Sequence, residues 1–255
     1  MNNIFDTHAH YDDAAFDEDR GSLLKDLPDM GIYAVITAGA DLESSLKASE
    51  ISKKYDYIYA AAGIHPENIQ GFGGNYVKNL EDIISGNKKV VAVGEIGLDY
   101  HFRTDNKEKQ KEVFLNQIEL ANKRGLPVLV HDRDAHADAM EILKRMKPHG
   151  VVHCFSGSLE MAKEVVKLGM FLGIGGVVTF KNAKTLVEVV KNMPLDVMVL
   201  ETDAPYMAPT PFRGKRCDSS MIKYTAEKIA EIKNIDVSEV LKITKNNAQK
   251  LFGIK

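Results

Sequence analysis

The regular alternation of short apolar runs with helical stretches constrains the fold of this chain more than any other feature. Eight apolar runs have the length and composition of strands, and they cover residues 4–8, 32–38, 57–63, 90–94, 128–131, 151–153, 170–174 and 197–200. Helical periodicity predicts helices over residues 42–54, 76–84, 106–124, 135–147, 159–168, 182–192, 219–233 and 237–252, with a glycine-rich loop at 71–74. Strict alternation of this kind is typical of a parallel sheet.

Eight such units in 255 residues predict a TIM (β/α)8 barrel, an α/β fold, with an extra C-terminal helix. We expect one domain over residues 1–255, because no linker, composition shift or low-complexity segment divides the chain. A doubly wound open sheet is the alternative. The Gly-x-Gly-x-x-Gly fingerprint that often follows its first strand is missing here.

Composition and charge narrow the class of protein. Hydrophobic residues make up 44% of the chain and charged residues 27%, as in globular proteins. No apolar run approaches the roughly 20 residues of a membrane span, and the N-terminus lacks a secretory signal, so we expect a cytoplasmic protein without membrane contact. The net charge of −3 does not indicate a nucleic-acid binder, so a polyanionic substrate would need a local basic patch.

Histidines and carboxylates gather where the expected strands end. The residues in such positions are His8, His10, His65, Glu95, His131, His153, Glu201 and Asp203. In a parallel barrel the C-terminal ends of all strands form one rim, so we expect these side chains to converge there. His101, His136 and His149 do not follow strands, and we interpret them as surface or loop residues.

Six of the rim residues predict a centre for two divalent metal ions. The candidate ligands are His8, His10, Glu95, His131, His153 and Asp203. They exceed the three protein ligands of an open zinc site, and two-metal sites commonly share a carboxylate. Glu95 is the candidate bridge, since its strand lies between the two histidine groups. His8 and His10, together with Asp203, would hold one ion. His131 and His153 would hold the other.

The chemistry of these ligands leaves the ions open among Mg²⁺, Mn²⁺ and Zn²⁺, because imidazole and carboxylate prefer different metals. Asp203 has a second candidate role, as the base that takes a proton from a metal-activated water. Glu201 would either hydrogen-bond behind the ligands or form a simple ion pair. Asp6 would orient an imidazole or be a buried aspartate bonded to the backbone.

Four further residues are candidate substrate contacts. His65 is a rim residue that could be a metal ligand, a hydrogen-bond donor behind the ligands or a contact to a substrate oxyanion. We favour the substrate contact, because the other ligands already serve the metal ions. Arg133 follows His131 by two positions, and Arg213 and Lys215 belong to the basic run after strand eight. Arginine forks suit phosphate oxygens, and this loop lies near the usual phosphate-binding corner of the barrel. For Arg133, Arg213 and Lys215 the alternative is that they are solvent-exposed charges without a ligand.

Six motifs stand in order along the chain. They are Asp6-Thr7-His8-Ala9-His10, Gly63-Ile64-His65-Pro66, Gly94-Glu95-Ile96-Gly97-Leu98-Asp99-Tyr100, Pro127-Val128-Leu129-Val130-His131, His153-Cys154-Phe155-Ser156-Gly157 and Glu201-Thr202-Asp203-Ala204-Pro205-Tyr206. Together they resemble the TatD family of metal-dependent deoxyribonucleases over essentially the whole chain. One departure is Cys217-Asp218-Ser219, where the family commonly has Asn-Glu-Pro.

This resemblance implies a TIM-barrel hydrolase of the amidohydrolase type with two divalent metal ions and the same six ligands. It implies a deoxyribonuclease of the 3′→5′ exonuclease type, dependent on magnesium or manganese, with nucleic acid (DNA, or RNA) as its substrate. Cleavage would proceed by attack of a metal-activated water on the phosphodiester bond.

Two alternatives remain open. The same ligands would serve another dinuclear-metal hydrolase acting on a different ester or amide, such as a D-aminoacyl-tRNA deacylase, because site chemistry alone does not separate these substrates. A barrel that has lost its chemistry is the second alternative, and the intact ligand set argues against it.

Overall fold

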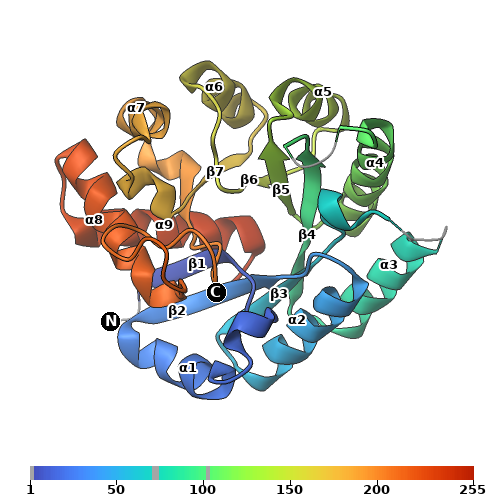
Figure 1. The fold of residues 1–255 in the computed structure, drawn as a ribbon, viewed down its shortest axis with the longest axis horizontal. Coiled ribbons are helices and arrows are strands. Elements are labelled where there is room, and N and C mark those ends of the chain that lie inside the picture. Colours follow the sequence, from blue (N-terminus) through green and yellow to red (C-terminus); the bar gives the residue numbers. More distant parts are fainter. Residues whose placement is uncertain (1–2, 71–74, 102–103) are drawn as a thin grey trace.

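Eight parallel strands hydrogen-bond to one another in sequence order in the computed structural model of this chain, which describes residues 3–70, 75–101 and 104–255. The strands are β1 (Ile4–Ala9), β2 (Ile32–Ala38), β3 (Ile58–Ala62), β4 (Val90–Asp99), β5 (Val128–Arg133), β6 (Gly150–Val152), β7 (Phe171–Ile174) and β8 (Met198–Leu200). Helices form an outer ring around them (Figure 1).

The helices follow the strands in alternation. They are α1 (Arg20–Asp26), α2 (Leu42–Lys54), α3 (Tyr76–Gly86), α4 (Lys107–Arg124), α5 (His136–Met146), α6 (Leu159–Lys167), α7 (Lys184–Asn192), α8 (Ile222–Lys233) and α9 (Val237–Phe252). Short 3₁₀ helices are η1 (Ala14–Phe16), η2 (Leu27–Met30), η3 (Pro66–Asn68), η4 (Gly176–Thr179), η5 (Leu195–Val197) and η6 (Ser219–Met221). None of the helices in the described part of the chain combines the length and apolar character needed to cross a membrane.

The barrel is nearly closed by a short contact between β1 and the segment after β8. The Asp203 N–H donates to the His8 carbonyl at 2.9 Å, and the His10 N–H donates to the Ala204 carbonyl at 2.6 Å. Ala9 and Ala204 form a parallel bridge between the two segments. The predicted TIM barrel and the extra C-terminal helix, α9, are therefore confirmed.

Asp6 adds side-chain bonds to this seam between β1 and β8. Its fully buried carboxylate accepts hydrogen bonds from the Thr202 N–H at 3.1 Å and the Thr202 hydroxyl at 2.6 Å. The Ser219 hydroxyl donates to it at 2.6 Å, and the His8 N–H at 3.2 Å. The interpretation of Asp6 as a buried aspartate bonded to the backbone is confirmed, and these bonds join the two ends of the barrel.

A cluster of strand residues and α9 fills the end of the barrel where the strands begin. Phe252 of α9 lies 6.0 Å from Phe5 of β1, measured between ring centroids. Leu251 belongs to the same cluster, with Leu129 of β5 and Val199 of β8. The extra helix thus covers the end opposite the rim, so the rim is the open end for polar side chains.

The main difference from the sequence prediction is the length of β4. We expected this strand to end at Gly94, but it continues to Asp99, so Glu95 lies within the strand rather than at its end. Gly97 is needed for close approach to β5, since an added Cβ would lie 1.9 Å from the His131 carbonyl oxygen. Helix α1 was also not predicted, and the loop expected at 71–74 lies outside the described residues.

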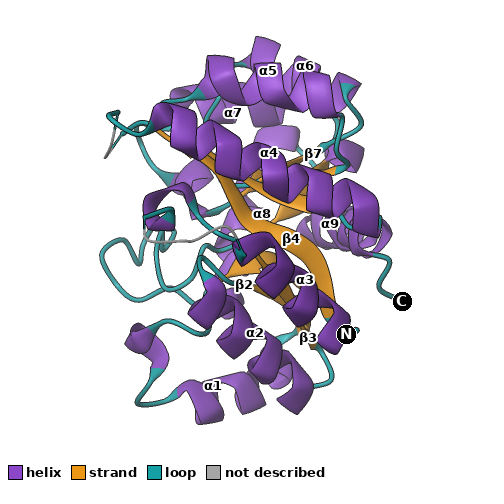
Figure 2. Ribbon diagram, turned by 90° about the vertical axis from the view of Figure 1, so that its right-hand side faces the viewer, coloured by secondary structure: helices purple, strands orange, loops and turns teal. Residues whose placement is uncertain are grey.

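Two buried glutamines of α4 hold backbone segments near the rim. The Gln110 amide accepts from the Asp99 N–H and donates to the Asp99 carbonyl, both at 2.8 Å. Two turns further along the same helix face, the Gln117 amide accepts from the Ile64 N–H at 2.7 Å and donates to the Ile64 carbonyl at 3.0 Å. Helix α4, which lies alongside β4 in Figure 2, therefore fixes the end of β4 and the residue before His65.

Replacement of Gly97 by alanine should destabilise the protein strongly. The backbone there has φ of 151°, and the new methyl group would collide with β5. We expect a loss in the free energy of unfolding of at least about 1–3 kcal/mol, measured by urea denaturation. Gly86→Ala is the matched control, because an added Cβ meets nothing within 4 Å at that helix position, and it should be neutral or stabilising by up to about 1 kcal/mol. Unchanged stability of Gly97→Ala would contradict this account.

Candidate metal centre

The rim of the barrel brings the six candidate ligands together around one carboxylate, that of Glu95 in β4. Four of the others approach Glu95 directly, and Asp203 approaches the first histidine pair. The centre is buried at its base, where Glu95 keeps 5% of its side-chain area exposed, whereas Asp203 keeps 17%. Asp203 therefore lies on the solvent side.

The two oxygens of Glu95 face different histidine pairs. Oε2 lies 3.3 Å from Nε2 of both His8 and His10. Oε1 lies 2.8 Å from Nδ1 of His131 and 2.9 Å from Nε2 of His153. A carboxylate that presents one oxygen to each side is the arrangement expected of a bridge between two cations.

Asp203 completes the first side. Its Oδ1 lies 3.4 Å from Nε2 of His10 and 3.8 Å from Nε2 of His8, and these two nitrogens are 3.1 Å apart. The Asp203 backbone has φ of 61°, a left-handed conformation that aspartate tolerates better than most residues. The seam between β1 and β8 is therefore what places this carboxylate beside the first histidine pair.

Hydrogen bonds to the outer ring nitrogens orient two of the imidazoles. Nδ1 of His10 lies 2.8 Å from the Ala38 carbonyl, which only accepts, so Nδ1 carries a proton. The Nε2 atom faces the centre and offers a lone pair once its own proton is lost. Nε2 of His131 is bonded to Asp99 Oδ2 at 3.0 Å, so its Nδ1 faces Glu95. Histidine ligands of metals usually donate their other N–H to a carbonyl or carboxylate in this way.

His65 has the opposite arrangement. Its Nδ1 accepts from the Glu67 N–H at 3.2 Å, so the proton of the neutral ring is on Nε2, which lies 3.5 Å from Glu95 Oε1. Burial lowers the pKa of His65 to about 3 and keeps the ring neutral. Although ligand atoms of His65, Glu95 and His131 lie within 4.8 Å of one another, this tautomer makes His65 a hydrogen-bond donor into the site.

Burial and mutual contacts shift the pKa values of the cluster in opposite directions. Burial, assisted by His153, lowers the pKa of His8 to about 4. Burial also opposes the charged form of His131, but bonds to Asp99 and Glu95 outweigh it and raise the pKa to about 10. For His10, bonds to Asp203 and Glu95 likewise overcome burial and hold the pKa well above its usual value. His10 and His131 are therefore protonated on both ring nitrogens, and positively charged, near neutral pH.

The carboxylates of the cluster stay ionised for the same reason. Burial alone would raise the pKa of Glu95, but the surrounding imidazoles, His153 first, hold it well below its usual value. The pKa of Asp203 is lowered against burial by its bond to His10 and by the charge of His153. Negative charge at the centre is thus matched by protons that a cation would displace.

Two acidic residues support the histidines from behind. Asp99 was missed by the sequence analysis, because β4 was expected to end before it; the signal was its alternate spacing with Glu95 on one long strand. Glu201 accepts a hydrogen bond from the Cys154 N–H and lies 3.7 Å from Nδ1 of His153. The 3.7 Å contact is within ion-pair distance and is not a hydrogen bond to the ligand, so the ion-pair alternative for Glu201 fits better. Burial raises the pKa of Glu201 to about 7.

The donor set fits divalent metal ions. Three overlapping groups have ligand atoms within 4.8 Å of one another, namely His8–His10–Glu95, His8–His153–Asp203 and His65–Glu95–His131. All donors are imidazole nitrogens or carboxylate oxygens, a combination that suits borderline and hard divalent ions. Once His10 and His131 lose their second protons, the hydrogen bonds at their outer nitrogens leave lone pairs directed inward, as metal binding requires.

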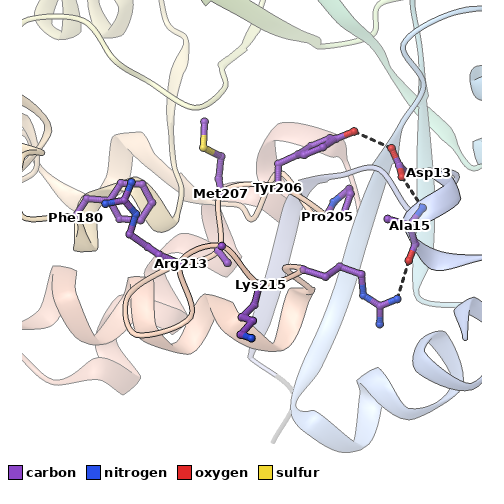
Figure 3. Close-up of a pocket in the computed structure, with 11 residues that line it drawn as sticks. Asp13, Ala15, Phe180, Pro205, Tyr206, Met207, Arg213 and Lys215 are labelled. Carbon is purple, nitrogen blue, oxygen red and sulfur yellow. Dashed lines mark hydrogen bonds between the residues drawn. The ribbon is translucent and has the colours of Figure 1, made fainter.

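A cavity of about 510 Å³ lies beside the loop after β8, and none of the six candidate ligands lines it (Figure 3). Arg213, Lys215 and Tyr206 line it. Tyr206, which is outside our sequence-based site, is the lining residue that also contacts the centre, because its ring lies 6.5 Å from the His10 ring between centroids. Arg216 of the same basic run is neutralised by Asp19 at 2.5 Å. On the other side of the rim, the predicted contact Arg133 is the exposed last residue of β5.

Among the described residues, no carboxylate lies within ion-pair distance of Arg213 or Lys215. The guanidinium of Arg213 instead stacks on the Phe180 ring, 4.2 Å from its centroid. Both cations therefore remain available to an anionic ligand in the cavity.

Comparison with known proteins agrees with this geometry. The sequence model of the family described as "TatD related DNase" matches residues 5–253. The protein named "Uncharacterized metal-dependent hydrolase YabD" from Bacillus subtilis is 42% identical over 254 residues, covering 98% of this chain and 99% of that protein. The similarly named YcfH of Escherichia coli K12 is 34% identical over 263 residues, covering 98% and 96%.

A solved structure gives the same result. The TatD homologue YJJV of Escherichia coli K12 superposes with a TM-score of 0.92 at 31% identity, covering 100% of this chain and 99% of that one. These relatives, together with the buried cluster of nitrogen and oxygen donors, show a metal-dependent hydrolase. The chain belongs to the TatD family of metal-dependent hydrolases.

Proposed function

We propose that this hydrolase is a deoxyribonuclease of the 3′→5′ exonuclease type that cleaves phosphodiester bonds at the Glu95 centre. The observation that carries the proposal is that Arg213 and Lys215 line the cavity and have no carboxylate partner among the described residues. They lie on the same rim as Glu95, whose two oxygens face different histidine pairs. Arginine and lysine recognise phosphate, and the family description "TatD related DNase" points to the same substrate class.

Two divalent ions would occupy the centre, with Glu95 between them. His8, His10 and Asp203 would hold one ion, and His131 and His153 the other, as their distances to the two Glu95 oxygens suggest. Bound there, the ions would polarise a phosphoryl oxygen and lower the pKa of a water molecule to about 7.

The protein's own groups would divide the remaining work. Asp203 is the more exposed carboxylate, so it is placed to take the proton of the attacking water and pass it to the leaving 3′ oxygen. The Nε2–H of His65 would donate to a phosphoryl oxygen. Arg133, Arg213 and Lys215 would contact backbone phosphates, which would make recognition largely independent of sequence.

Glu95→Gln should retain the fold but lose at least one metal ion. Glutamine keeps the size of the side chain and removes the charge between the two histidine pairs. We expect a fall in kcat of more than about 100-fold on a 3′-labelled oligodeoxynucleotide, since even partners of metal ligands are worth 10–100-fold. Elemental analysis and the hydrolysis assay, with chelator-treated wild type as reference, measure both effects.

The matched control is Glu119→Gln, which removes the same charge at an exposed position of α4 and should leave both measurements unchanged. Full metal content and turnover in Glu95→Gln would exclude Glu95 from the centre. Hydrolysis of D-aminoacyl-tRNA, without hydrolysis of DNA by the wild type, would replace the nuclease with the deacylase alternative.

Metal binding should release protons, because ions and protons compete for the same nitrogens. Against the effect of burial, hydrogen bonds keep His10 and His131 charged at neutral pH in the metal-free protein, the latter with a pKa of about 10. Metal affinity should therefore rise with pH up to about 10, as fewer protons must be displaced. Calorimetry in buffers of different ionisation enthalpy should count at least about two protons released per chain near pH 7, because, against the effect of burial, Glu95 also raises the pKa of His153. Binding with no proton release would contradict these protonation states.

The double variant Arg213→Ala/Lys215→Ala should bind single-stranded DNA more weakly, with a flatter salt dependence. Each lost phosphate contact lowers the slope of log K against log salt by about 0.7, so we expect a change of about 1.4. Lys54→Ala/Lys250→Ala removes the same charge from exposed helix positions away from the cavity and should change the slope little. An equal slope in both double variants would move the phosphate contacts elsewhere on the rim.

A further inference from the structure

An exposed aromatic side chain with an exposed methionine beside it forms one wall of the cavity next to the centre. Four large hydrophobic side chains are exposed in the described part of the chain, and they are Met30, Leu46, Tyr206 and Met207. Only the last two line this cavity, and 54% of the surface of Tyr206 is exposed. Two adjacent exposed apolar groups beside a reactive centre are more informative than scattered single ones.

Tyr206 is held in place at both ends. Its hydroxyl donates to Asp13 Oδ2 at 2.8 Å, and its N–H donates to the Asp203 carbonyl at 2.8 Å (Figure 3). The other oxygen of Asp13 accepts from the Ala15 N–H at 2.7 Å, so this carboxylate is engaged on both sides. The ring is therefore preorganised, and a ligand that stacks on it does not have to order it first.

The opposite wall is aromatic and cationic. In Figure 3, Phe180 and the guanidinium of Arg213 lie together on one side of Met207, and Tyr206 lies on the other. The loop that carries Tyr206, Met207 and Arg213 is fixed at two points. The Thr210 N–H donates to the Thr179 hydroxyl at 2.8 Å, and the Cys217 N–H donates to the Pro205 carbonyl at 2.9 Å.

We propose that this cavity binds an unpaired nucleotide next to the scissile phosphate, with the base against Tyr206 and Met207 and a backbone phosphate against Arg213 and Lys215. This proposal rests on the proposed nuclease function. A flat apolar wall beside two cations matches a planar base joined to a phosphate, and 510 Å³ lies within the range of small-ligand sites. Because the Tyr206 ring also contacts the His10 ring, at 6.5 Å between centroids, a base on Tyr206 would lie one side chain away from the centre.

The consequence is a preference for single-stranded or frayed ends. A base that is paired and stacked in a duplex cannot reach Tyr206 without being unstacked, which costs free energy. Stacking on an aromatic ring depends little on base identity, so the preference should be for strandedness rather than for sequence.

A double-mutant cycle between the ring and the base tests this site. Wild type and Tyr206→Ala, both loaded with Mn²⁺, are compared on single-stranded oligodeoxynucleotides. These carry either all bases or an abasic nucleotide at the last or the penultimate 3′ position. Dissociation constants from fluorescence anisotropy, with Ca²⁺ replacing Mn²⁺ to slow turnover, and kcat/KM are both measured. Tyr206→Ala should weaken binding of the complete strand by about 5- to 100-fold.

On the strand that is abasic at the contacted position, Tyr206→Ala should cause no further loss, because the stacking partner is already absent. Tyr206→Phe keeps the ring and should retain most of the affinity. Leu46→Ala, at an exposed position outside the cavity, should behave like wild type. Wild type should also cleave a single-stranded end faster than a blunt duplex end, and Tyr206→Ala should reduce that difference.

An equal loss from Tyr206→Ala on the complete strand and on both abasic strands would overturn the proposal, because the ring would then act only through the protein. Full affinity of Tyr206→Ala for every strand would overturn it as well. If wild type hydrolyses none of the strands, the nuclease function fails instead. The binding measurements need no turnover, so in that case they alone show whether a base binds against Tyr206 in the cavity.

Discussion

The contact between β1 and the segment after β8 is the constraint on which the rest of this structure depends. Every other strand pair joins neighbours in the sequence, whereas this one joins Asp6 to Thr202, 196 residues apart. Burying the charge of Asp6 is costly, and burial raises its pKa to about 6 even though several donors favour the ionised form. The same seam positions candidate ligands, because it carries His8 and His10 on one side and Asp203 on the other.

The side of the centre that contains His131 depends on β4, which continues past Gly94, where we expected it to end. Because β4 continues past Gly97, Glu95 reaches the middle of the rim, and Asp99 reaches the outer nitrogen of His131. The side-chain amide of buried Gln110 holds the end of this strand by bonding to both the N–H and the carbonyl of Asp99. Glu95 and His131 are therefore positioned by strands and a packed helix, and such support gives the rigidity that metal sites require.

The sequence was sufficient for the barrel and for the clustering of the candidate ligands, because strand-end positions in a parallel barrel converge whatever the loops do. It was insufficient where the outcome depends on a particular close contact. The strand was expected to end at Gly94, because the tight approach of Gly97 to β5 is invisible in one strand. Tyr206 and the pairing of Arg216 with Asp19 were missed because both are set by contacts across about 190 to 200 residues of chain.

The seam also sets the order in which function can appear during synthesis. Residues 8 and 10 leave the ribosome first, but their carboxylate partner at residue 203 follows only after most of the chain has emerged. Domains of this size fold as the chain is made, and contacts of high sequence separation form late. A nascent chain that displays the first six strands therefore exposes an open sheet edge at β1 and an incomplete set of donors. The candidate centre can be complete only when the barrel closes, so an unfinished chain that stops before residue 203 lacks one of its carboxylates.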